Sequence, residues 1–71
     1  MDYVIIREDF DGNKLLSRHY LVDYYPDQEK QSWGPFDMAV RLEAGQATEV
    51  LADIIANNIA SPSRFYMNPV K

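Results

Sequence analysis

The chain has 71 residues, no cysteine and an ordinary globular composition, with 46% hydrophobic and 25% charged residues. This composition excludes a collagen-like or natively disordered chain, and the length predicts a single small domain over residues 1–71. Eleven acidic and seven basic residues give a net charge of −4, which disfavours binding to nucleic-acid phosphates. Because disulfides and thiolate metal sites are excluded, oligomerisation is the remaining way to reinforce so small a core.

The first part of the chain predicts an antiparallel pair of strands. Residues 2–8 are rich in β-branched and aromatic side chains, which is typical of a strand. Asp11-Gly12 supplies the positive φ that a hairpin turn needs, and residues 14–25 follow as a second strand. Strict alternation along this second strand predicts one shared face for Leu16, Tyr20, Val22 and Tyr24.

A polar connector over residues 26–30 leads to Ser32–Phe36, which form either a short third strand or a turn around Gly34-Pro35. From Phe36 the apolar residues recur at helical spacing. Two interpretations remain open: a single helix over 36–59, or a helical turn over 37–42 followed by a main helix over 44–59. We favour the second, because Gly45 weakens a continuous helix by about 1 kcal/mol relative to alanine.

Ser61-Pro62 ends any preceding helix, and residues 64–70 form a last strand in which Pro69 indicates a sheet edge. The predicted fold is therefore an α+β domain of order β-β-(β)-α-β, a mostly antiparallel sheet with one main helix packed on one face. The first strand is apolar on both sides, since Ile5 points to one face and Val4 and Ile6 to the other. One helix cannot cover both faces, so we expect another molecule to cover the second.

Five short features follow one another along the chain. They are Tyr3-Val4-Ile5, Trp33, an Ala-x-x-Leu step from Ala39 to Leu42, Ala47 in the helix, and the final strand Phe65 to Val70. In this pattern the sequence resembles a group of short bacteriophage and prophage accessory proteins, although its second strand and connector are longer. The resemblance implies a small phage-encoded protein of the kind that in some cases binds and inhibits a host factor, and it assigns no functional residue.

The residues that could carry chemistry do not form a recognisable catalytic or metal site. His19 is the only histidine, and Ser17 and Asp23 on the same strand cannot reach it as a triad would. The Asp9–Asn13 segment lacks the glycine and glutamate positions of an EF-hand loop, so it reads as an ordinary turn. We therefore predict no catalytic residue, no metal, no cofactor and no enzymatic activity.

The aromatic residues Tyr24, Tyr25 and Trp33 flank the acidic connector that contains Asp27 and Glu29. Aromatic side chains ringed by charge are typical of protein-binding patches, and these five residues are the predicted partner-binding site. The alternative role of Trp33 is to fill the core between helix and sheet.

We expect a small protein-binding module that binds a host factor or a second copy of itself. Alternative functions are a self-assembling homodimeric structural protein and a weak single-stranded nucleic-acid binder, for which displayed tyrosines could stack on bases. No signal peptide, lipidation signal or membrane-length apolar run is seen, which predicts a cytoplasmic protein without a membrane partner.

Overall fold

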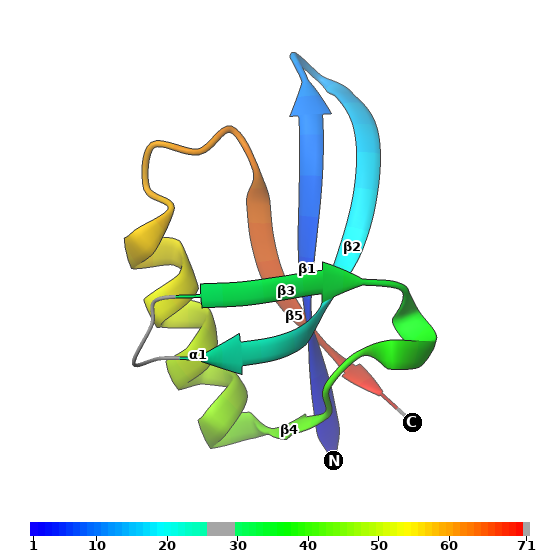
Figure 1. The fold of residues 1–71 in the computed structure, drawn as a ribbon, viewed down its shortest axis with the longest axis vertical. Helices are drawn as coiled ribbons and strands as arrows, with labels where there is room; N and C mark the ends of the chain where they lie inside the picture. Colours follow the sequence, from blue (N-terminus) through cyan, green and yellow to red (C-terminus); the bar gives the residue numbers. More distant parts are fainter. Residues whose placement is uncertain (26–29, 71) are drawn as a thin grey trace.

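The structure is a computed structural model that describes residues 1–25 and 30–70 (Figure 1). Within these residues the elements follow in the order β1 (Asp2–Asp11), β2 (Lys14–Tyr25), β3 (Lys30–Gly34), the 3₁₀ turn η2 (Phe36–Met38), β4 (Leu42–Glu43), α1 (Ala44–Asn57) and β5 (Arg64–Val70). The strands form one antiparallel sheet, and α1 packs against it. The predicted α+β class is confirmed, and β5 has the predicted bounds.

Strand β1 lies at the centre of the sheet. It pairs with β2 from Ile6 to Asp11 and with β5 from Asp2 to Glu8. Strand β4 pairs with the first two residues of β1, on the edge opposite β5. This position is open to β4 because β2 pairs with β1 only from Ile6 onwards. The end of β2 pairs instead with β3, which crosses in front of β1 in Figure 1. Gly12, with φ 61°, makes the predicted turn between β1 and β2.

A β-bulge in β2 changes which side chains share a face. The register with β3 shifts between Leu21 and Asp23, so Val22 has no direct partner. In a regular strand, residues an even number of positions apart point to the same face. An extra residue inverts this alternation, so such residues on the two sides of the bulge point to opposite faces. Tyr24 packs against the core, whereas Tyr20 lies on the outer face of the sheet. The prediction that Tyr20 and Tyr24 share a face is therefore wrong.

The core lies between the sheet and α1. Its largest fully buried side chains among the described residues are Ile5 of β1, Leu21 of β2 and Ile54 of α1. Partly buried apolar side chains surround them: Tyr24, Trp33, Val40, Leu42, Val50, Leu51, Phe65 and Met67. The predicted helix on one face of the sheet is thus placed against the face that carries Ile5.

The second face of β1 is covered in large part by the chain itself. Val4 and Ile6 point away from α1, yet only 2% and 3% of their surfaces are exposed. Tyr20 of β2, Phe36 of η2 and the end of β5 lie around them. The turn after β3 folds back over this face and buries both side chains, and that another molecule covers the remaining surface stays a prediction.

The favoured interpretation of the helical region is confirmed, with a short turn before a separate main helix. The turn is limited to η2, and two residues of extended chain, β4, follow it before α1. At the start of α1, the backbone N–H of Glu43 donates to the side-chain oxygen of Gln46 at 3.3 Å. At its end, the side-chain amide of Asn58 donates to the carbonyl of Ile54 at 2.8 Å. Asn58 thereby ends the helix at Asn57, before the predicted 59.

Gly45 lies in the first turn of α1, and replacing it with alanine is expected to stabilise the protein by about 0.5 kcal/mol. An added Cβ would meet nothing within 4 Å, so only the reduced entropy of the unfolded chain changes. Urea unfolding followed by circular dichroism measures this. Gly12→Ala is the contrasting variant and should destabilise by about 1 kcal/mol, because its φ is positive. A loss of stability at Gly45→Ala would contradict the observed start of α1.

Candidate functional site

An open hollow, lined mainly by apolar residues but with nearly as much polar as apolar exposed surface, lies on the face of β1 that points away from α1. Its volume is about 290 Å³, and it is lined by Val4, Ile6, Tyr20, Phe36, Asn68, Pro69 and Val70. The ring of Phe36 is 50% exposed and stands edge-on to the ring of Tyr20, with 5.2 Å between centroids and 76° between planes. An aromatic ring half exposed to water beside a hollow is a common feature of protein-binding surfaces.

Backbone hydrogen bonds hold Phe36 in this position. The N–H of Met38 donates to the carbonyl of Pro35 at 3.1 Å, and the N–H of Ala39 donates to the carbonyl of Phe36 at 3.0 Å. The N–H of Val40 then donates to the carbonyl of Leu21 at 2.9 Å, which ties the end of the turn to β2. The wall of the hollow is therefore preformed and does not depend on a loose loop.

Acidic residues adjoin this face at two places. Asp2 and Glu43 are direct cross-strand partners, and Asp2 also pairs with Val70 of the hollow. Asp37 follows Phe36 directly in η2. Like charges directly opposite each other on a sheet repel, and among the described residues none of these three carboxylates forms an ion pair.

Further along the same face, two arginines lie around one glutamate. Glu8 is the cross-strand partner of both Arg18 on β2 and Arg64 on β5. Its carboxylate is 2.6 Å from Nη2 of Arg18 and accepts a hydrogen bond from Nε at 2.8 Å. These hydrogen bonds from Arg18 are the main reason that the pKa of Glu8 lies below its usual value, although burial acts against them. The Arg64 guanidinium lies over the ring of Tyr66, 5.5 Å from its centroid.

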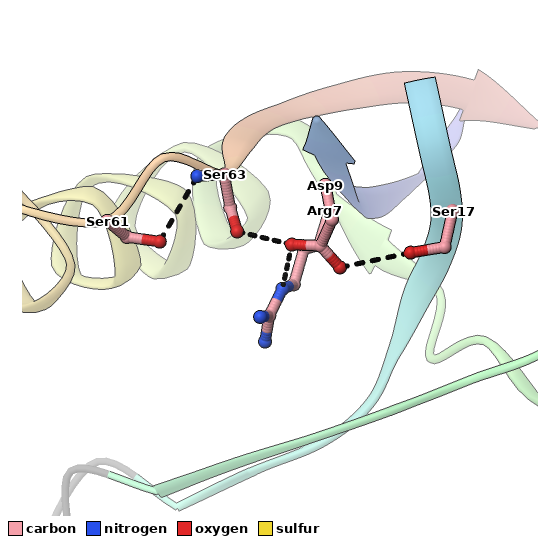
Figure 2. A network of polar contacts seen from close by, with 5 residues as sticks. All are labelled: Arg7, Asp9, Ser17, Ser61 and Ser63. Carbon is pink, nitrogen blue, oxygen red and sulfur yellow. Dashed lines mark hydrogen bonds and ion pairs between the residues drawn. The ribbon is translucent and has the colours of Figure 1, made fainter. Parts of the chain in front are cut away.

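On the opposite face of β1, a polar network surrounds Asp9 (Figure 2). Its carboxylate accepts hydrogen bonds from Nε of Arg7 at 3.0 Å, from the hydroxyl of Ser17 at 3.1 Å and from the hydroxyl of Ser63. The backbone N–H of Ser63 in turn donates to the hydroxyl of Ser61 at 3.2 Å. The network joins β1, β2 and the loop between α1 and β5.

The network around Asp9 has the properties of a structural contact. The hydrogen bond from Ser63 is the main reason that the pKa of Asp9 is lowered, and burial opposes this effect. A carboxylate that is held ionised and occupied by three donors is a poor general base. His19, the cross-strand partner of Arg7, is exposed beside it. We therefore assign this cluster to holding the loop before β5 against the hairpin.

The structure places the predicted partner-binding residues in different environments. Tyr24 and Trp33 pack against the core, and the hydroxyl of Tyr24 donates to Asp53 of α1 at 2.9 Å. Tyr25 is 47% exposed. The other two predicted residues lie outside the described part of the chain: Asp27 and Glu29. The three aromatic side chains therefore do not form one exposed patch.

The residues of the hollow were missed at the level of sequence. Tyr20, Phe36 and Asn68–Val70 belong to three segments that are far apart along the chain. The helical spacing of apolar residues begins at Phe36, although this residue lies in η2 and outside the main helix. The available signal was the apolar character of both faces of β1, which indicates that something must cover Val4 and Ile6.

Further comparisons give no other assignment. Among residues 1–25 and 30–70, no three His, Cys, Asp or Glu side chains are grouped as metal ligands would be. Within the same described ranges, no helix has the length and apolar character needed to cross a membrane. Comparison with protein-family models, with curated proteins and with solved structures finds no match to this chain.

Proposed function

We propose that this chain is a small protein-binding module without catalytic activity, and that its hollow receives an apolar part of another protein molecule. The observation that carries the proposal is the half-exposed ring of Phe36 on the wall of an open hollow. Covering this ring and the hollow would remove apolar surface from water, which is the main source of protein association energy. Central aromatic side chains of this kind often supply most of the binding energy.

The distribution of charge on the same face supports protein binding over nucleic-acid binding. Asp2 pairs with Val70 and Asp37 follows Phe36, so acidic residues adjoin two of the residues that line the hollow. Carboxylates beside the hollow would repel a phosphate backbone laid over them. The resemblance to short phage accessory proteins adds a host protein to the candidate partners, beside a second copy of the chain.

The proposal is tested by affinity capture with the tagged chain. The source is a nuclease-treated lysate of the organism that encodes the chain, and untagged chain is added so that a second copy can also be captured. Phe36→Ser is expected to retain at least about tenfold less of the bound protein than the unmodified chain does, because it removes the aromatic contact. Ile59→Ser is the matched control, since Ile59 is 87% exposed beyond the end of α1. It should capture as the unmodified chain does.

Circular dichroism of each variant shows whether its fold is intact. The proposal fails if the unmodified chain retains no protein, or if a folded Phe36→Ser variant retains as much as the control.

A further inference from the structure

We infer that residues 58–63, the loop between α1 and β5, form a strap that opens while the rest of the domain stays folded. The catch that keeps the strap closed is the hydrogen bond from the Ser63 hydroxyl to the Asp9 carboxylate (Figure 2). Asp9 lies on the side of β1 opposite the hollow, so this inference does not depend on the proposed function.

The strap is tied down differently at its two ends. At the α1 end, the side-chain amide of Asn58 donates to the carbonyl of Ile54 at 2.8 Å, and the N–H of Ser61 donates to the carbonyl of Asn58 at 2.9 Å. These bonds are local and only continue the last turn of the helix. At the β5 end, the bond from Ser63 to Asp9 is, among the described residues, the one side-chain hydrogen bond that joins the strap to the sheet.

The acceptor of the catch is held in place without the strap. Oδ2 of Asp9 accepts the hydrogen bond from Ser17, its direct cross-strand partner on β2. Oδ1 accepts the bonds from Nε of Arg7 and from Ser63. Arg7 and Ser17 both belong to the β1–β2 hairpin, so both stay in position when the strap moves. The strap therefore closes on a fixed carboxylate and opens by the loss of one hydrogen bond to a charged group.

The strap has little else to hold it down. None of its six residues, all of which the structure describes, is buried, and Ile59 is 87% exposed. The fully buried Ile54 lies before the strap, in α1. A segment with few buried contacts opens at a lower free energy than the whole domain, and its opening exposes little new surface.

Acid opens the strap, because the catch needs an ionised Asp9. Arg7 is the charged side chain that acts on this carboxylate, and His19 is the titratable side chain beside Arg7 on β2. The sequence of the strap contains no charged residue, and Arg64 at the start of β5 pairs with the opposite face. The bond from Ser63 is the main reason that the pKa of Asp9 lies below its ordinary value of 3.8. Opening returns the pKa towards that value, so the open strap gains population as the pH falls below it.

The test is hydrogen exchange of single backbone amides, followed by NMR in urea from zero to about 1 M. In the unmodified chain, the amides of Ser61 and Ser63 are expected to exchange faster than that of Leu51 in the middle of α1. Their rates should barely change with urea, because strap opening exposes little surface, whereas the rate at Leu51 should rise with urea as unfolding does.

Two variants that each remove one hydroxyl from Asp9 identify the catch. Ser63→Ala should speed exchange at residues 61 and 63 about tenfold, because the closed state loses a hydrogen bond to a charged group. Ser17→Ala is the matched control. The bond from Ser17 is present whether the strap is open or closed, so its loss should change exchange in the strap by less than about threefold.

Each result supports or overturns part of the inference. Strap amides that match Leu51 in rate and in urea dependence would show that the strap opens only when the domain unfolds, and this comparison needs no variant. Unchanged exchange in Ser63→Ala, or equal acceleration by Ser17→Ala, would overturn Ser63 as the catch.

The acid response is measured on the same amides. Their exchange, relative to that of an unstructured peptide, should rise between about pH 5 and about pH 3 in the unmodified chain and stay level in Asp9→Asn. A level response in the unmodified chain, or an equal rise in both, would overturn control of the strap by Asp9.

Discussion

Trp33→Ala is expected to lower the free energy of unfolding by about 3 kcal/mol. The indole packs against the buried cluster of Ile5, Leu21 and Ile54, and its centroid lies 5.8 Å from that of Phe65. A domain of this length has a total stability on the order of 5 kcal/mol, so the loss would bring the variant close to unfolding at physiological temperature. Because Trp33 is the only tryptophan, urea unfolding has to be followed by far-ultraviolet circular dichroism instead of its fluorescence.

Tyr25→Ala is the control for this prediction. Tyr25 is half-exposed on the neighbouring strand, so its removal should change the free energy of unfolding by less than about 1 kcal/mol. A loss of under about 1 kcal/mol for Trp33→Ala as well would show that the indole contributes little to the core. Trp33 would then return to its predicted role as part of a partner-binding patch.

The parts of the fold that follow from short stretches of sequence were predictable. The β-branched run at the start gives β1, the positive φ of Gly12 gives the hairpin, and Pro69 marks β5 as an edge strand. Gly45 lies one residue inside α1, which is why the break before the main helix could be placed. In each case the deciding property is the conformational preference of a few neighbouring residues.

The features that depend on pairing between distant segments were not predictable in this way. Strand β4 has only two residues, and only its position beside the start of β1 makes it a strand. The bulge at Val22 follows from the register between β2 and β3, and an alternating pattern in a single strand carries no sign of it. That one residue decides that Tyr24 faces the core and Tyr20 the hollow.

The candidate site illustrates the same limit. The sequence showed that both faces of β1 are apolar, but it did not show that the turn after β3 folds back so that Phe36 reaches Tyr20. The partner-binding prediction joined Tyr24, Tyr25 and Trp33 because they are close in sequence and aromatic. Aromatic character alone does not distinguish a core side chain from an exposed binding residue, since a large apolar ring is favourable in both positions.

Acid is expected to destabilise the fold through two adjacent carboxylates that face opposite sides of β1. The pKa of Glu8 lies below its ordinary value of 4.5, mainly because of the hydrogen bonds from Arg18. The pKa of Asp9 lies below its ordinary value of 3.8, mainly because of the hydrogen bond from Ser63. A carboxylate whose pKa is lower in the folded state binds protons more readily when the chain unfolds. Its stabilising contribution is therefore complete above the ordinary pKa and is lost as the pH falls through the lower, folded value.

Melting temperatures recorded by circular dichroism from neutral pH to about pH 2 measure this effect. Asp9→Asn should cost on the order of 1–3 kcal/mol at neutral pH, because the donors around it lose a charged acceptor. The stability of this variant should then fall less steeply than that of the unmodified chain below the ordinary aspartate pKa, since one of the two titrating groups is gone. Glu49→Gln, an exposed carboxylate on α1, should keep the original slope. Parallel curves of stability against pH for Asp9→Asn and the unmodified chain would show that the network in Figure 2 does not couple folding to protonation. The acid sensitivity would then have to come from the Glu8–Arg18 pair on the other face.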